Sequence, residues 1–209
     1  MSDDEQARAR RFVRVEDQHS FIAAHGALRL LLGAMLDASP QSFTFAANAY
    51  GKPSLAPDLG VEFNMSHSGG IVLIGFARRI PIGVDVEALR PMTERAAIVR
   101  RYFHPAEAAD FARVPPAEAE GAFFRCWSRK EAVVKALGFG MSLDLHRYRV
   151  SCIPGATPEV LALEGDEAAP ENWSLIDLDP GPGHVGAVAA RRRPLTVIRA
   201  EFDPRTMPG

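Results

Sequence analysis

The sequence predicts an α+β fold organised as two halves, residues 1–83 and 84–209. A helical segment followed by strand-like segments occurs twice along the chain, and the two occurrences meet near Gly83. The length of 209 residues is enough for one substantial core or for two half-domains of about 100 residues each.

In the first half, apolar residues at helical spacing predict a helix over 17–36, among them Phe21, Leu28 and Leu32. A loop follows, and the segment YGKPSLAP, residues 50–57, contains two prolines that keep it open. Three short strands are then expected at 61–66, 70–77 and 80–88, separated by the turns HSGG and RRIP.

The second half begins with three expected helices, over 93–103, 104–114 and 117–138. Pro105 suits the first turn of the second of these helices, and Gly138 suits the end of the third. Beyond Gly140, four segments alternate like strands, at 146–153, 172–179, 184–191 and 195–202. Loops rich in proline, glycine and acidic residues join them.

The composition is that of an ordinary soluble globular protein, with 47% hydrophobic and 24% charged residues. Because the formal net charge is −2, the protein has no overall field to attract nucleic acid or a membrane surface. Any anion must therefore bind at a local basic cluster. The longest apolar run, IVLIGFA at 71–77, is too short to span a bilayer, so no membrane partner is expected.

The two cysteines, Cys126 and Cys152, lack the spacing of metal ligands, and the chain is long enough to fold without disulfides. The first residues, MSDDEQARARR, lack the apolar run of a secretory signal. We therefore expect no structural disulfide and a reducing, cytoplasmic location.

The segment WSRKEAVVKALGFG, residues 127–140, holds two of the three lysines in the chain. On a helix, Trp127, Glu131 and Lys135 follow one another at i, i+4 and i+8 and share one stripe. A surface Glu–Lys pair is the ordinary interpretation. Because arginine supplies most positive charges here, Lys135 is better explained as a compact ammonium beside a phosphate. For Lys130, a buried stem with a solvated ammonium is an adequate explanation.

Two carboxylates are expected side by side on the strand IPIGVDVEA. Strand alternation puts Ile82 and Val84 on one face, with Gly83, Asp85 and Glu87 on the other. Such a pair repels unless a hard divalent cation binds it, and Mg²⁺ takes carboxylates together with water and substrate phosphate. The alternative is a solvent-exposed acidic strand end, which is the better interpretation of this segment taken alone.

Two further segments could bind anions. In FNMSHSGG, hydroxyls, an imidazole and open backbone N–H groups at Ser66, His67 and Ser68 could cradle a phosphate; the alternative is a plain hairpin turn. Lys52 in GKP is a weaker candidate. A basic cluster at the entrance to the first helix is either a solvated arm or a clamp for a polyanion, and it consists of Arg8, Arg10, Arg11 and Arg14.

Taken in order, GKP, NMSHS, GVDVE and WSRKEAVVKALGFG resemble the motifs of the surfactin-type 4′-phosphopantetheinyl transferases. This resemblance covers residues from about Arg10 to Arg191. It implies a pseudo-dimer of two similar α+β halves with the active site in the cleft between them. It also implies a monomer that transfers phosphopantetheine from coenzyme A to a serine of an apo acyl or peptidyl carrier protein.

The resemblance also assigns roles to residues. It implies Mg²⁺ ligation by Asp85 and Glu131, with Glu87 a third ligand or a nearby support; Mn²⁺ accepts the same oxygen ligands. Glu131, or a water it orients, would take the serine proton, and Lys135 would contact the phosphates. Coenzyme A phosphates would be held by Ser66, His67 and Lys52, with Arg8 at the 3′-phosphate.

Other assignments stay open in the sequence. Proximity suggests four residues for the carrier-protein surface, namely Arg100, Arg101, Phe103 and Phe124. A Mg²⁺-dependent phosphohydrolase would use a similar residue set and would release phosphate without a carrier. A non-catalytic module that binds coenzyme A or a carrier is a third possibility. Nucleic-acid binding ranks last, because only 8% of residues are aromatic and no recognised module is present.

Overall fold

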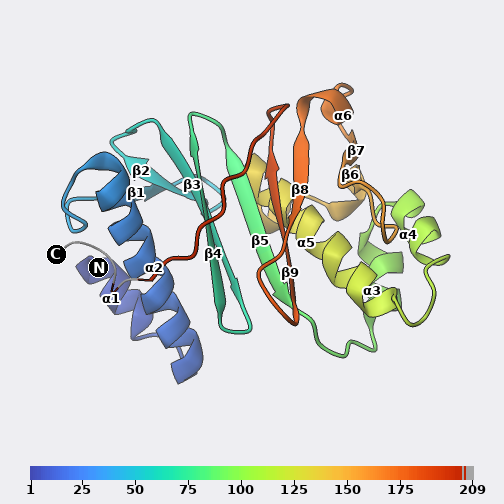
Figure 1. The fold of residues 1–209 in the computed structure, drawn as a ribbon, viewed down its shortest axis with the longest axis horizontal. Coiled ribbons are helices and arrows are strands. Elements are labelled where there is room, and N and C mark those ends of the chain that lie inside the picture. Colours follow the sequence, from blue (N-terminus) through green and yellow to red (C-terminus); the bar gives the residue numbers. More distant parts are fainter. Residues whose placement is uncertain (204, 206–209) are drawn as a thin grey trace.

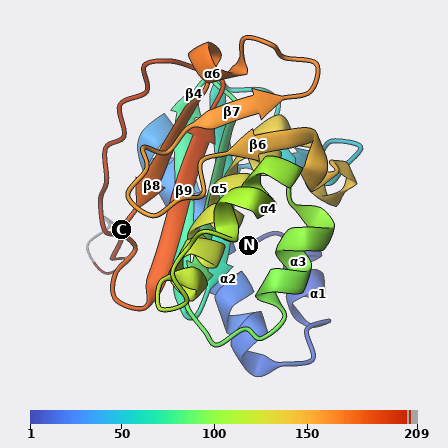
Figure 2. The same ribbon diagram turned by 90° about the vertical axis from the view of Figure 1, so that its right-hand side faces the viewer.

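The computed structural model, which describes residues 1–203 and 205, confirms the α+β class. Strands occupy the centre of the molecule in Figure 1, with two helices at one end, α1 (Asp3–Ala9) and α2 (Val15–Leu36). The long helix α5 (Ala119–Leu137) lies against the central strands. At the opposite end, which faces the viewer in Figure 2, are α3 (Arg95–Tyr102) and α4 (Pro105–Phe111).

The strands form four small antiparallel groups. β1 (Thr44–Ala47) pairs with β2 (Pro53–Ala56), and β3 (Val61–Ser68) pairs with β4 (Ile71–Arg78). The three-stranded sheet has the order β5 (Ile82–Ala88), β9 (His184–Ala190), β8 (Ser174–Leu178). The last group is β6 (Tyr148–Val150) with β7 (Val160–Leu163), which the short helix α6 (Ala169–Asn172) follows.

The predicted boundary at Gly83 falls inside β5, which begins at Ile82 and pairs with β9 of the second half. The first half contributes α1, α2 and β1 to β4, and the second contributes everything from β5 onward. Each half has its own principal core. Leu28, Leu32 and Phe63 lie in the first core, whereas Phe124, Val133 and Tyr148 lie in the second.

By length and composition, α2 is apolar enough to cross a membrane, although polar residues interrupt its apolar runs. In this fold a third of its most apolar window is buried. Leu28 and Leu32 on this helix pack into the first core, and Arg29 pairs with Glu5 of α1 at 2.9 Å. Leu28 and Leu32 of α2 therefore serve as core residues here.

Helix α5 crosses β5 at very close range, and Gly83 permits this approach. A Cβ atom added at Gly83 would lie 2.0 Å from the Ala132 carbonyl oxygen and 2.3 Å from the Ala136 nitrogen. Both are backbone atoms of α5, so no side-chain movement could relieve the clash. The helix ends as predicted, with Gly138 in the left-handed region at φ 76°.

The strand predicted at 195–202 is wrong. The structure assigns no strand there, and the segment runs in irregular conformation across the strands toward the N-terminal end in Figure 1. Val197 packs on the small apolar cluster around Ile82, Val84 and Val188, and Arg199 donates to the Asp177 carbonyl. The alternation of apolar residues in 195–202 arises because one side of this segment lies on the sheet. The segment forms no backbone ladder, which a strand requires.

Several short elements were not predicted: α1, β1, β2, β7 and α6. Pro53 is the first residue of β2, the position where a strand tolerates proline, so the prolines of 50–57 do not exclude a strand. Ser2 caps α1 and exchanges hydrogen bonds with Glu5. These elements have only four to seven residues each, too few for a reliable periodicity.

The expectation that the chain lacks a disulfide is also wrong. Cys126 of α5 and Cys152, just beyond β6, are joined, with their Cα atoms 5.0 Å apart. Both cysteines are buried, because α5 packs over the end of β6. The pairing removes the argument for a reducing compartment that was based on these two residues.

Lys130 is fully buried, so the expectation of a solvated ammonium is wrong. Its Nζ donates to Glu107 Oε2 at 2.8 Å, to Glu107 Oε1 at 3.0 Å and to the Tyr148 carbonyl at 3.0 Å. Glu107 also accepts from the backbone N–H groups of His104 and Val150. The pair thus joins α4, α5 and β6, with every proton of the ammonium used.

We predict that Lys130→Met lowers the free energy of unfolding by about 3 kcal/mol, because it leaves the Glu107 carboxylate buried without its cation. Urea unfolding measures the change. The matched control is Arg147→Met, which breaks the exposed pair with Glu164 and should lower the free energy of unfolding much less. Equal losses in the two variants would contradict a structural role for the buried pair.

Candidate functional site

Asp85, Lys135 and Ser66 meet where the two halves join. Lys135 Nζ lies 2.7 Å from Asp85 Oδ1 and 3.0 Å from Ser66 Oγ. Ser66 Oγ in turn donates to Asp85 Oδ1 at 2.9 Å. The three side chains come from β5, α5 and β3, so the cluster forms only when the halves are together.

Close packing of α5 on β5 produces this meeting. Ser128 Oγ of α5 donates to the Asp85 backbone carbonyl at 3.2 Å. Glu131 and Lys135 lie one helical turn apart on α5, as the predicted stripe requires. Gly83, on the same face of β5 as Asp85, lets the helix come this close.

The second carboxylate oxygen of Asp85 is an orphan. Among the described residues, Oδ2 is buried and has no hydrogen-bond partner, although Asp85 is only 3% exposed. A buried carboxylate oxygen without a partner is costly, so a native structure that keeps one requires an explanation. A cation bound at this oxygen would supply the missing partner. The alternative of a solvent-exposed acidic strand end does not describe Asp85.

Glu87 and Glu131 extend the same negative cluster. Burial, reinforced by the negative charge of Asp85, raises the pKa of Glu87 above its usual range. Burial followed by the charge of Asp85 likewise raises the pKa of Glu131, with a further contribution from Glu87. Three carboxylates therefore share a partly buried region with the single ammonium of Lys135. This donor set and the free Oδ2 fit Mg²⁺ or Mn²⁺, which bind oxygen ligands.

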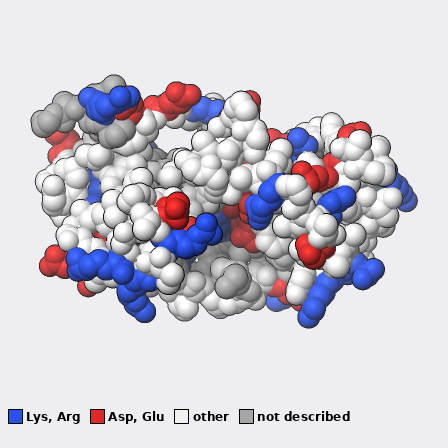
Figure 3. Space-filling view, turned by 90° about the horizontal axis from the view of Figure 1, so that it is seen from below, with Lys and Arg blue, Asp and Glu red and all other residues white. Residues whose placement is uncertain are grey.

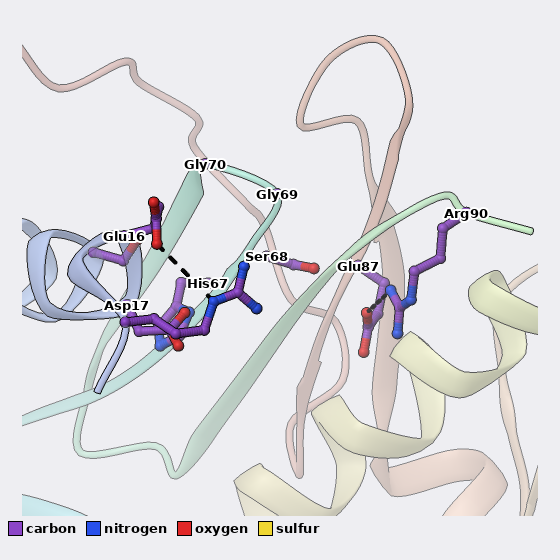
Figure 4. Close-up of a pocket in the computed structure, with 10 residues that line it drawn as sticks. Glu16, Asp17, His67, Ser68, Gly69, Gly70, Glu87 and Arg90 are labelled. Carbon is purple, nitrogen blue, oxygen red and sulfur yellow. Dashed lines mark hydrogen bonds and ion pairs between the residues drawn. The ribbon is translucent and has the colours of Figure 1, made fainter. Parts of the chain in front are cut away.

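A hollow of about 560 Å³ opens beside the cluster. The start of α2, the β3–β4 hairpin and the end of β5 line it; among its residues are Arg14, Asp17, His67, Glu87 and Arg90. Figure 4 shows Asp17 and His67 on one side and Glu87 with Arg90 on the other. Figure 3 shows acidic and basic side chains gathered around the central hollow of this face. Glu87 belongs to both the hollow and the carboxylate cluster.

The residues predicted to hold coenzyme A phosphates separate into two groups. His67 is exposed and lines the hollow. Ser66 is buried and bonded to Asp85 and Lys135, and Lys52 Nζ donates to the carbonyls of Ile82 at 3.1 Å and Ala136 at 3.2 Å. Both of these side chains are already engaged within the protein, so a direct phosphate contact would require them to exchange partners.

Within the N-terminal basic cluster, the structure favours a different arginine from the predicted one. Arg8 lies on α1, where its guanidinium stacks over the Phe21 ring at 5.3 Å, and it does not line the hollow. Arg14, at the N-cap of α2, does. The sequence identified the cluster but could not determine which member faces the site, because α1 and the turn after it set that direction.

The four candidates for a carrier surface also divide. Arg100 and Arg101 are exposed on α3, as the prediction requires. Phe103 and Phe124 are only 2% and 1% exposed, so they cannot contact a partner, and their selection was wrong. Phe103 instead stacks with Phe123 and Trp127, and Trp127 packs against the second core.

Sequence reasoning also missed Asp17, Arg90 and Ser128. Arg90 Nη1 lies 3.3 Å from Glu87 Oε2 and joins the hollow at the exit of β5. Its spacing of three residues from Glu87 was the available signal. Asp17 and Ser128 carried no comparable signal, because their relevance depends on which neighbouring element the fold brings close.

Comparison with known proteins yields one consistent family. Residues 81–189 match the 4′-phosphopantetheinyl transferase superfamily. The 4′-phosphopantetheinyl transferase HetI of Nostoc sp. is 34% identical over 192 residues, which cover 90% of this chain and 78% of that protein. The 4′-phosphopantetheinyl transferase Sfp of Bacillus subtilis is 32% identical over 151 residues, 72% of this chain and 66% of that protein.

The similar solved structures overlap with little more than half of this chain, as one example shows. The acyl-carrier-protein synthase of Chronobacterium ammoniagenes in complex with coenzyme A covers 55% of this chain and 98% of its own, at 16% identity and a TM-score of 0.40. The family assignment comes from the sequence relatives and from the matched region, which contains Asp85, Glu131 and Lys135. The chain therefore belongs to the 4′-phosphopantetheinyl transferase superfamily, and its relatives place it in the surfactin-type group.

Proposed function

We propose that this chain transfers the 4′-phosphopantetheine group of coenzyme A to a serine of an apo acyl or peptidyl carrier protein, with Mg²⁺ as cofactor. The observation that carries the proposal is the orphaned Asp85 Oδ2 in a cluster of three carboxylates and one lysine. That cluster adjoins a hollow that could accommodate part of a nucleotide-sized substrate. Membership in the family supports the same reaction.

Asp85, Glu131 and Glu87 would hold the Mg²⁺. When bound, the ion would neutralise phosphate oxygens and polarise the phosphorus that is attacked. Lys135, from the same rigid helix as Glu131, would contact the phosphates and stabilise charge on the leaving group. Its present partners, Asp85 and Ser66, keep the ammonium ordered before the substrate arrives.

The transfer exchanges one phosphorus–oxygen bond for another. The carrier serine Oγ forms a bond to the β-phosphorus, and the bond between that phosphorus and the bridging oxygen breaks. The leaving group is adenosine 3′,5′-bisphosphate, which takes the electron pair. Glu131, or a water it orients, takes the serine proton.

The direct test incubates an apo carrier protein with this chain, coenzyme A and Mg²⁺ and measures the carrier by intact-protein mass spectrometry. We expect a mass gain of one phosphopantetheine group, which a chelator abolishes. Several unrelated carriers should be tried, because no residue identifies the preferred one. Release of phosphate from coenzyme A without any carrier would instead support a phosphohydrolase.

We predict that Asp85→Asn lowers turnover about 100-fold or more, since loss of residues that merely support metal ligands already costs 10- to about 100-fold. The same variant should weaken Mn²⁺ binding measured by electron paramagnetic resonance. Glu164→Gln, which changes an exposed carboxylate far along the chain, is the control and should match the wild type. Wild-type turnover in Asp85→Asn would exclude the proposed metal site.

We predict that Arg14→Ala raises the KM for coenzyme A about fivefold, as expected for loss of one partly solvated contact between an arginine and a phosphate. Arg8→Ala is the matched control, because Arg8 belongs to the same basic cluster but packs on Phe21. Steady-state kinetics with coenzyme A and its 3′-dephospho form will compare the two variants. A larger effect at Arg8 would restore the prediction made from the sequence.

A further inference from the structure

β3 and β5 run side by side at the junction of the halves, yet they belong to different sheets. On its other side β5 is paired along its whole length with β9. The β3 side of β5 would therefore leave backbone N–H groups without a ladder partner. Side chains of β3 satisfy two of these groups.

Asn64 Oδ1 accepts from the Val84 backbone N–H at 2.8 Å, and Ser68 Oγ accepts from the Ala88 backbone N–H at 3.0 Å. Both contacts join residues 20 apart, so the two strands run in the same direction and in a fixed register. Ser66 lies midway between Asn64 and Ser68 and donates to Asp85. Alternate residues of NMSHS thus all face β5.

We propose that Asn64 and Ser68 are positioning residues, a clamp that fixes β5 against β3 and thereby holds Asp85 and Glu87 in place. The two clamp bonds bracket the segment 84–88, which carries both carboxylates. Asn64 is 7% exposed, so loss of its oxygen would leave the Val84 N–H without a replacement acceptor from bulk solvent. Slippage of β5 would separate Asp85 from Ser66 and would move Glu87 relative to the hollow.

This inference gives the motif NMSHS a role different from the anion cradle expected from the sequence. His67, which faces away from β5, is exposed and lines the hollow together with Ser68, whose oxygen already accepts from the Ala88 N–H. Asn64 and Ser66 are both buried and bonded to β5. The consequence for metal binding rests on the proposed function, whereas the clamp itself does not.

The test uses the full chain without substrate and has two readouts. Amide hydrogen exchange at Val84 and Ala88, resolved by NMR, reports the clamp, and Mn²⁺ affinity by electron paramagnetic resonance reports its consequence. In Asn64→Leu we expect exchange at Val84 about tenfold faster and Mn²⁺ binding about fivefold weaker, because a lost buried acceptor opens the strand locally. Ser68→Ala should accelerate exchange at Ala88. Ser68→Thr, which keeps the hydroxyl, should exchange at the wild-type rate.

Leu28→Ala, which leaves a cavity in the first core, controls for general destabilisation. It should lower the midpoint temperature of unfolding and leave Mn²⁺ affinity unchanged. Unchanged exchange at Val84 in Asn64→Leu and at Ala88 in Ser68→Ala would overturn the clamp. Faster exchange with wild-type Mn²⁺ affinity would overturn the positioning role. If the wild type itself bound no Mn²⁺, the proposed metal site would fail, while the exchange rates would still decide the clamp. Because Ser68 is only partly buried, Ser68→Ala keeps the test available should Asn64→Leu not fold.

Discussion

The direct contact between helix α5 and strand β5 is the constraint on which the site depends. At Gly83 the backbones of the two elements approach so closely that no Cβ atom fits between them. Asp85 is the next residue of β5 on the same face as Gly83. The close spacing there lets Lys135 Nζ lie 2.7 Å from Asp85 Oδ1. A larger separation would leave the ammonium short of the carboxylate and would expose the cluster to water, which would weaken every charge interaction in it.

The surroundings of the two lysines of α5 give Lys130 a structural role and Lys135 a place in the candidate site. Lys130 is matched by one carboxylate, and its remaining proton goes to a backbone carbonyl, so the pair has no capacity left for a ligand. Lys135 faces a cluster of three carboxylates, and even with Arg90 3.3 Å from Glu87 negative charge remains in excess. That excess of negative charge is the property that attracts a divalent cation and then a phosphate. The structural Lys130 and the site residue Lys135 are only five residues apart on α5.

Local periodicity explains which parts of the site could be predicted from the sequence. The helical repeat placed Glu131 and Lys135 on one stripe, and strand alternation placed Asp85 and Glu87 on one face, because those relations are fixed within a single element. The burial of Lys130 against Glu107 and the bonding of Ser66 to Asp85 depend on how elements pack. The orientation of Arg14 over Arg8 depends on α1, a seven-residue helix that hydrophobic periodicity cannot identify.

Both halves are needed to form the site, because side chains of the first half donate hydrogen bonds to backbone carbonyls of β5 and of the end of α5. Lys52 donates to carbonyls at the start of β5 and in the last turn of α5, where a positive charge also suits the helix dipole. Asn48 donates to the Gly138 carbonyl just beyond the same helix. Together with the contact of Ser66 with Asp85, these bonds tie the first half to the start and middle of β5 and to the C-terminal end of α5. Separation of the halves would therefore break hydrogen bonds that first-half side chains donate to β5 and α5, the elements that carry Asp85, Glu131 and Lys135. The geometry of the carboxylate cluster is thus energetically coupled to the docking of the halves.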